Sequence, residues 1–254
     1  MTSFDFDFDG IPEPRRAAFA DFGRTLAQVA GDNLLGLCAF GGWIVDDRCY
    51  ERAPARSVAV LKQTDLPMLD RLASQGSRFG RKGVAAPLVM TPEYIQASRD
   101  VFPLELLEIQ QLHKLIVGDD HFSDLKFAPA DLRLQSEREL KSELIHLRQG
   151  LIAATGHHKA LDEVCAAAAE RTIRVLRGVL HLAGKDVPRL ALDVMTSTAE
   201  VTGLKLVTLA RAAVGADRLD FDGFQRCYSE VEALARHVDE LDKSPSAGRA
   251  QQAD

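Results

Sequence analysis

The chain has 254 residues, of which 46% are apolar, enough for one large domain or two ordinary ones. Its 37 acidic and 31 Lys or Arg side chains give a formal net charge of -6, which excludes an extended, nonspecific nucleic-acid surface. The N-terminus lacks a signal-peptide pattern and no apolar run approaches the roughly 20 residues of a membrane span, so we expect a cytoplasmic protein without a membrane partner.

The first segment alternates Phe and Asp over residues 4–9. A period of two is compatible with an edge strand, and an acidic tail that docks its aromatic side chains on the body is the alternative. Pro12 and Pro14 then precede residues 15–30, where apolar side chains recur at helical spacing and Gly31 is a favourable stop. We expect a helix over this range.

Two short apolar runs follow, at 34–40 and 58–61, and the connection between them begins with Gly41 and Gly42. Both runs are bounded by turn residues and are too short for stable helices. They therefore predict two buried strands joined through a glycine turn. We expect these strands to pair in one sheet.

Beyond the second strand, Thr64 or Asp65 can cap a helix. The basic, glycine-containing segment 76–83 follows, and we expect a solvated hairpin there. The alternative is a loop that binds phosphate through its backbone N–H groups. Residues 86–90 predict a third strand, after which Thr91 is a suitable cap for another helix.

Acidic and apolar residues mix over 104–109 without clean alternation, so strand and helix both remain open for this stretch. Glu105 and Glu108 have no evident partner, and we expect both on the surface. His113 and His121 lie further along, without a pattern typical of a base and its nucleophile.

From residue 129 onward, apolar residues recur every three or four positions between glycine stops, which predicts a series of helices. Leu140, Leu144, Leu147 and Leu151 repeat at this spacing, and we expect the face they form to be buried against the helix that starts near His158. A homodimer formed through this helical half is a further expectation.

The predicted fold class is therefore α+β. Residues 1–128 form an α/β domain in which helices flank a small mixed sheet of three strands, at 34–40, 56–61 and 86–90. Residues 129–242 form a helical bundle. The polar tail, 243–254, is predicted to be disordered.

This order of elements, together with the Phe-Pro-Leu-Glu stretch at 102–105, resembles the nucleotidyltransferase superfamily, in the branch that includes the aminoglycoside adenylyltransferases. The resemblance covers roughly residues 15–151. It implies that the first domain has a nucleotidyltransferase-like fold. In that family the first strand ends in a Gly-Ser that cradles the nucleotide phosphate, and the next strand carries an Asp-x-Asp pair that holds the metals.

The chain departs from that pattern at each expected carboxylate. Gly42 and Trp43 stand at the Gly-Ser position, and Arg56 and Val58 stand where the resemblance places the two acids. Residues 87–90 supply no carboxylate for a general base. A cation at this position repels a metal ion beside it. The resemblance therefore implies a nucleotidyltransferase-like fold that has lost the family's usual chemistry.

We therefore predict a catalytically degenerate protein that binds a nucleotide or a regulatory partner, with no catalytic residue, no metal and no cofactor. Gly41 and Gly42 would let a phosphate approach the backbone, with Trp43 beside them. Arg56 or Lys62 would supply the positive charge of the missing metal.

Two alternatives remain open. Asp46, Asp47 and Glu51 could be displaced metal ligands, which would make the chain an active nucleotidyltransferase that uses ATP and Mg²⁺. The other alternative is a helical interaction or dimerisation protein for which the first domain is only a scaffold. The four cysteines are scattered and form no C-x-x-C pair, which argues against zinc.

Overall fold

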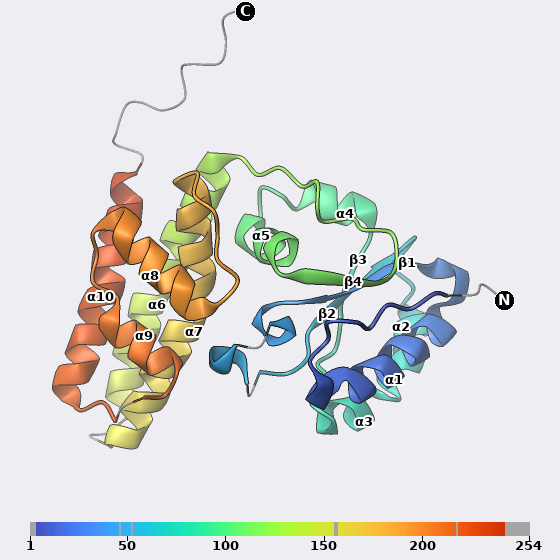
Figure 1. Ribbon diagram of the computed structural model, residues 1–254, viewed down its shortest axis with the longest axis horizontal. Coiled ribbons are helices and arrows are strands. Elements are labelled where there is room, and N and C mark those ends of the chain that lie inside the picture. Colours follow the sequence, from blue (N-terminus) through green and yellow to red (C-terminus); the bar gives the residue numbers. More distant parts are fainter. Residues whose placement is uncertain (1–3, 46, 52, 155–156, 217, 242–254) are drawn as a thin grey trace, which may run out of the picture. The chain divides into compact units, whose positions relative to one another are not determined.

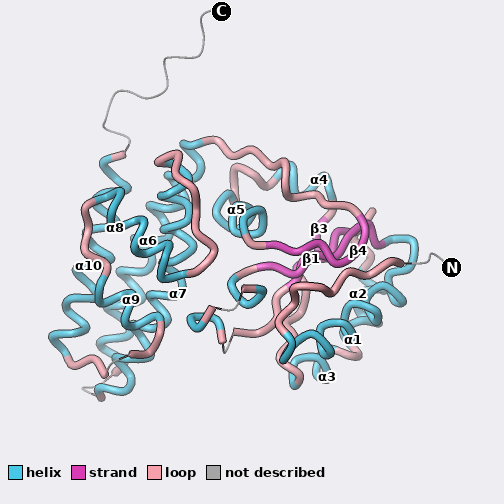
Figure 2. Tube along the Cα trace, in the orientation of Figure 1, coloured by secondary structure: helices cyan, strands magenta, loops and turns pink. Residues whose placement is uncertain are grey.

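The computed structural model describes residues 4–45, 47–51, 53–154, 157–216 and 218–241. The chain divides into two compact units, residues 1–128 with 187–191 and residues 129–186 with 192–254. The architecture is α+β, as predicted: a small sheet with helices in the first unit, and helices in the second (Figure 2). Among the described residues, no helix is long and apolar enough to cross a membrane.

The first unit surrounds a four-stranded sheet (Figure 1). Its elements are α1 (Glu13–Ala30), η1 (Gly31–Asn33), β1 (Leu34–Phe40), η2 (Gly42–Ile44), η3 (Arg48–Tyr50), β2 (Ser57–Leu61), α2 (Leu66–Ala73), α3 (Gly76–Arg81), β3 (Leu88–Met90), α4 (Pro92–Ala97), α5 (Pro103–Gln111) and β4 (His113–Gly118). The three η elements are single 3₁₀ turns.

The strand order is β3-β2-β1-β4, which places β1 and β2 at the centre of the sheet. These two strands are antiparallel, with Cys38 opposite Val58, so the predicted pairing is confirmed. β3 runs parallel to β2, and β4 runs antiparallel to β1. The expected three-stranded sheet was wrong, because β4 adds a fourth strand. Only Leu115 to Val117 are apolar in β4, and a run of this length is too short to indicate a strand. The strand forms because its backbone pairs with β1.

Helices cover both faces of the sheet (Figure 1). On one face, Phe19, Phe22 and Leu26 of α1 pack with residues of α2, α3 and the central strands. The aromatic side chains at the N-terminus pack against this cluster, and the Asp7 N–H donates to the carbonyl of Ile116. On the other face, α4 and α5 contribute to a second apolar cluster, and that face carries the charged groups described below.

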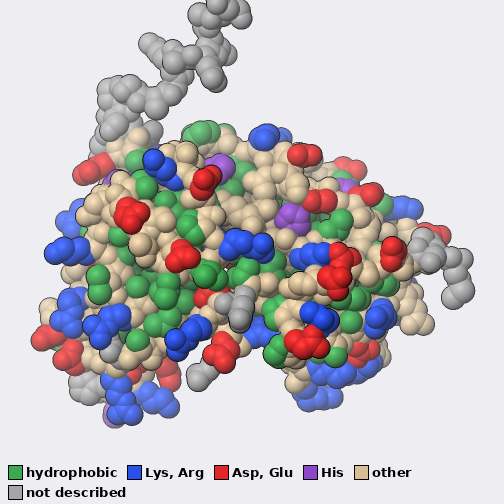
Figure 3. All heavy atoms as spheres, in the orientation of Figure 1, with side chains coloured by type: hydrophobic (Ala, Val, Ile, Leu, Met, Phe, Trp, Pro, Cys, Tyr) green, Lys and Arg blue, Asp and Glu red, His purple; other side chains and the backbone are tan. Residues whose placement is uncertain are grey.

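Two local expectations in this unit were wrong. Residues 76–83 contain the helix α3, not a hairpin, and blue side chains gather over it in Figure 3. Arg78 and Lys82 both contact Asp21 of α1, at 2.5 and 2.9 Å. This pairing directs the basic segment towards α1. The second wrong expectation concerns Glu108 of α5, which was expected on the surface and is buried.

The second unit contains only helices within its described residues: α6 (Pro129–Ala153), α7 (His158–Leu182), α8 (Ala191–Thr202, whose first residue belongs to the first unit), α9 (Val207–Ala213) and α10 (Phe221–Glu240). Leu140, Leu144 and Leu147 are buried and Leu151 is partly buried, so the predicted burial of this face is confirmed for three of its four leucines. α6 packs against both α7 and α10. Leu134, on another side of α6, is 57% exposed. The tail predicted to be disordered lies outside the described residues.

Candidate functional site

The glycine turn begins where β1 leaves the sheet. Gly41 has a φ of 91°, a backbone conformation that side chains other than glycine rarely adopt. Its N–H donates to the carbonyl of Leu112 beside β4, and the N–H of Phe40 donates to the carbonyl of Arg56 beside β2. The turn is therefore held from both neighbouring strands, and its position in the sheet is fixed.

Gly42 is a glycine for a different reason. A Cβ at this position would lie 2.0 Å from the ring of Tyr50, so the aromatic ring rests directly on the backbone. Trp43 is 3% exposed, meets Phe19 edge-on at 5.1 Å, and donates its indole N–H to the carbonyl of Arg56 at 3.0 Å. Packing therefore occupies Gly42 and Trp43, and it leaves Gly41 as the part of the turn that faces a charged group.

That charged group is the guanidinium of Arg56. A Cβ on Gly41 would lie 3.5 Å from Nη1 of Arg56 and 3.8 Å from Oε1 of Glu108. The two side chains form an ion pair at 3.5 Å, in which Arg56 is 39% exposed and Glu108 only 8%. The guanidinium also lies 4.4 Å from the ring centroid of Phe40. It is thus held between a buried carboxylate, an aromatic face and solvent.

Glu108 was missed in the sequence because an acid was assumed to be exposed. Its position on the helix indicates burial, because Leu104 and Leu112 stand four residues before and after it and both are 1% exposed. A helix through this stretch places Glu108 on the buried side, where a cation is needed to compensate its charge. Arg56 supplies that cation.

The strand positions expected to hold metals do not offer ligands. Arg56 and Val58 share one face of the chain, since strand residues two apart point the same way. Val58 is fully buried and packs in the cluster that includes Phe40 and Ile109. Between them, the hydroxyl of Ser57 is buried and has no hydrogen-bond partner in the described part of the chain.

Lys62 lies away from this group. It follows β2 at the end opposite Arg56, and its N–H donates to the carbonyl of Asn33 just before β1. Six strand residues correspond to about 20 Å. Of the two cations that the sequence offered for a phosphate, only Arg56 lies beside the glycine turn.

Of the three displaced acids considered above, Asp46 lies outside the described residues. The carboxylate of Asp47 already accepts from the N–H of Cys49 at 2.9 Å and from the N–H of Ala191 at 2.7 Å. Glu51 is exposed, and its backbone carbonyl accepts from the guanidinium of Arg15. No group of three or more His, Cys, Asp or Glu that could hold a metal occurs among the described residues.

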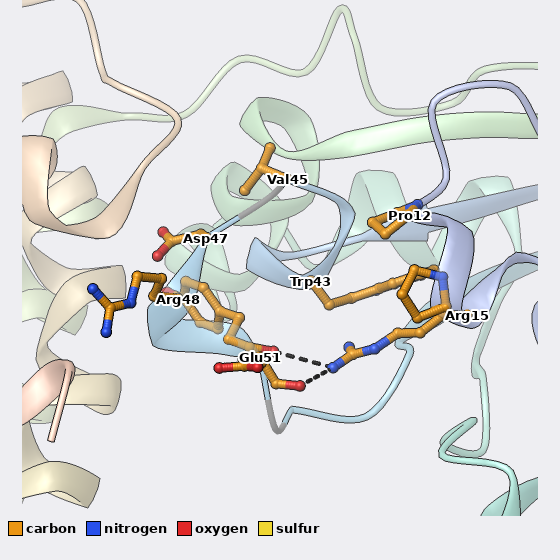
Figure 4. A pocket seen from close by; sticks show the side chains of 9 residues that line it. Pro12, Arg15, Trp43, Val45, Asp47, Arg48 and Glu51 are labelled. Carbon is orange, nitrogen blue, oxygen red and sulfur yellow. Dashed lines mark hydrogen bonds between the residues drawn. The ribbon is translucent and has the colours of Figure 1, made fainter.

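A cavity of about 560 Å³ lies between the start of α1 and the connection after the glycine turn (Figure 4). It is lined by Pro12, Pro14, Arg15, Trp43, Val45, Asp47, Arg48, Tyr50 and Glu51. Two cations and two acids balance in this lining, so its charge favours neither an anion nor a metal. The cavity combines segments about thirty residues apart, and no local pattern in the sequence indicates it.

A hydrogen-bonded group lies at the C-terminal end of α5, the helix that carries Glu108. Nδ1 of His113 donates to the carbonyl of Ile109 at 2.9 Å, and its Nε2 lies 3.1 Å from Oδ2 of Asp120. Burial raises the pKa of Asp120, but hydrogen bonds from the hydroxyl of Ser123, the N–H of Phe122 and His113 outweigh it and bring the pKa to about 2.

The geometry thus offers a half-exposed cation beside a backbone position without a Cβ. This arrangement can bind an anion such as phosphate, because a guanidinium presents several N–H donors and a glycine permits close approach. Neither the comparison with protein-family models nor that with curated proteins gives a match for this chain.

Proposed function

We propose that this protein is a non-catalytic nucleotide-binding protein whose first unit has a nucleotidyltransferase-like fold, and that Arg56 holds a nucleotide phosphate beside Gly41 without a divalent metal. One observation carries the proposal: the Arg56 guanidinium lies beside Gly41 and is 39% exposed. A cation therefore stands next to the turn at a strand position where the resembled enzymes carry a metal-binding acid.

The contacts of Arg56 suit this role. Its ion pair with Glu108, at 3.5 Å, is longer than a well-formed charge-assisted hydrogen bond, which leaves most guanidinium N–H groups for a ligand. The ring of Phe40 supports the guanidinium from one side. Arg56 is thus positioned by the fold, and within the described residues its ion-pair partner is Glu108, which leaves N–H donors for a ligand.

The same contacts argue against catalysis by the two-metal route. In-line phosphoryl transfer needs the charge on the phosphoryl oxygens to be neutralised, mainly by metals on fixed carboxylates. Arg56 and Val58 supply none, and Val58 is fully buried. A guanidinium can bind a phosphate, but alone it supplies neither the second ion nor a general base.

Binding of ATP in the presence of EDTA tests the proposal. We expect the wild-type protein to bind and Arg56→Gln to bind about ten-fold or more weakly, because hydrogen bonds to charged groups contribute roughly 1.5–3 kcal/mol. Lys62→Gln is the matched control: it removes one Lys charge about 20 Å away along the strand and should leave the affinity unchanged. Failure of the wild type to bind ATP, or equal losses in the two variants, would refute the proposal.

A further inference from the structure

The second unit carries a surface that nucleotide binding in the first unit does not use. On α6, six exposed residues lie at successive spacings of four and three: Leu134, Arg138, Lys141, Ile145, Arg148 and Ile152. We call these residues the α6 stripe. At 100° per residue they fall within an arc of about 80°, and they extend about 27 Å along the helix.

The apolar members of the α6 stripe are among the most exposed of the large apolar side chains described. Leu134, Ile145 and Ile152 are 57%, 51% and 79% exposed. Scattered apolar residues on a surface are ordinary, but these three lie on one line of the helix and alternate with the cations of the stripe. α7 packs on a different side of α6, where Arg171 pairs with Glu143, and α10 packs along one edge of the stripe, where Asp239 contacts Lys141.

The stripe is also basic. Arg138 and Arg148 are exposed, and the side chain of Lys141 is 58% exposed. Among the described residues, the acids in ion-pair contact with these cations are Glu137 and Asp239, both at Lys141. Arg148 donates to the carbonyl of Leu144 and lies 6.0 Å from the ring of Tyr228, neither of which neutralises its charge. The stripe therefore keeps an excess of positive charge in a chain whose net charge is -6.

The geometry points to an acidic amphipathic helix of a partner protein as the occupant of the α6 stripe. Apolar side chains on one line of a helix are anchors by which helices pack lengthwise, and here Leu134, Ile145 and Ile152 stand eleven and seven residues apart, about three and two turns. Charges of opposite sign beside such anchors select the partner. A nucleic acid would use the cations but gain little from Leu134, Ile145 and Ile152.

A second copy of this chain fits less well. In an antiparallel pair of α6 helices about a two-fold axis at residue 143, Arg138 of one copy faces Arg148 of the other, twice by symmetry. In a parallel pair, every cation of one copy faces the same cation of the other copy. Like charges placed opposite each other are destabilising, so charge complementarity favours an acidic partner over self-association.

The probe for the test is a synthetic helical peptide of about 18 residues with Leu at the contact positions and Glu on either side. A matched peptide with Lys in place of each Glu is the control. Fluorescence anisotropy with the full chain should show preferential binding of the Glu peptide, weakened by salt. Ile145→Ser should reduce the affinity about ten-fold. Val207→Ser, which alters an apolar residue of α9 that is 61% exposed, is the control and should have no effect.

Charge reversal gives the sharper result. The double variant Arg138→Glu/Arg148→Glu should prefer the Lys peptide, while Arg236→Glu, at an exposed position of α10, should keep the wild-type preference. A wild type that binds neither peptide, or both equally, would overturn the proposal. So would a concentration-dependent dimer abolished by Ile145→Ser, or displacement of the Glu peptide by poly-U with no effect of Ile145→Ser. Melting curves establish that each variant is folded.

Discussion

Each unit contains an Arg–Glu pair with a buried carboxylate, and the two pairs differ in geometry. In the second unit, Arg171 meets Glu143 through two hydrogen bonds of 2.5 and 2.9 Å, across the contact between α6 and α7. In the first unit, Arg56 and Glu108 make one contact at 3.5 Å beside the glycine turn. The carboxylates are similarly buried, with 5% and 8% of their side chains exposed.

The difference lies in how far the guanidinium is committed to its carboxylate. The bidentate pair fixes both side chains, and the hydrogen bonds that Arg171 donates to Glu143 raise the pKa of Arg171 above its ordinary value. The looser pair compensates the charge of Glu108 but leaves N–H donors of Arg56 to a ligand. The same two residue types thus serve as a structural clamp in one unit and as a candidate binding group in the other.

The largest expected effect concerns the apolar contact beside the clamp. Leu144→Ala should reduce the free energy of unfolding by on the order of 2–5 kcal/mol, because this leucine is buried on α6, which packs against α7 and α10. Chemical denaturation measures the loss. Ile145→Ala changes a neighbouring side chain that is 51% exposed and should cost under about 0.5 kcal/mol. Equal losses would mean that the face carrying Leu144 is not core.

Breaking the clamp should have the next largest effect. Arg171→Ala leaves Glu143 buried without its bidentate partner, and we expect a loss of about 2–3 kcal/mol, reduced from the full value for a buried pair because Arg171 is 45% exposed. Arg236→Ala removes an exposed ion pair with Glu232 and should change stability by less than about 1 kcal/mol. If both variants lose the same amount in urea titrations, the clamp is only a surface pair.

The hydrogen-bonded group at the C-terminal end of α5 should give a smaller, pH-dependent effect. The folded-state pKa of Asp120, about 2, lies below its ordinary value. Its stabilisation is therefore present above about pH 4 and is lost as the pH falls towards 2. Asp120→Asn should cost about 1 kcal/mol at pH 7, a value discounted for its exposure, and should flatten the acid limb of stability. Asp124→Asn, at a nearby exposed acid, is the control and should preserve that limb.

The smallest effect on stability, and the most informative for binding, is expected from Glu108→Gln. The change keeps the side-chain shape and removes the negative charge beside Arg56. We expect little change in unfolding free energy and an increase in ATP affinity of about five-fold, because the guanidinium loses a competing anion. A decrease in ATP affinity would mean that Glu108 positions Arg56 and does not compete for it.

Much of the fold could be predicted where local chemistry decides it. The carboxylate of Asp65 accepts from the N–H of Met68, and the hydroxyl of Thr91 accepts from the N–H of Tyr94, so both predicted caps are confirmed. The pairing of β1 with β2 followed from two apolar runs and a glycine turn. These features depend on residues close together in sequence or on strong periodicity.

The features that could not be predicted depend on contacts between distant segments. β4 is a strand because β1 offers its backbone, and α3 is directed by Asp21 of α1. Position 42 needs a glycine because the ring of Tyr50, eight residues later, rests on its backbone. No pattern in the sequence indicates that contact. In the candidate site, the resemblance was enough to predict Gly41 and Arg56. Predicting their partner Glu108 would have required knowing which side of α5 is buried.

The central claim, binding of a nucleotide without a metal, is tested most directly by calorimetric titration with ATP, once in EDTA and once in excess Mg²⁺, followed by an assay for transfer of label from ATP. The account predicts similar affinities in the two titrations and no transfer to aminoglycoside, protein or nucleic-acid acceptors. Binding that requires Mg²⁺, with transfer of label that disappears in the Asp46→Ala/Asp47→Ala variant, would contradict it and establish the active nucleotidyltransferase instead.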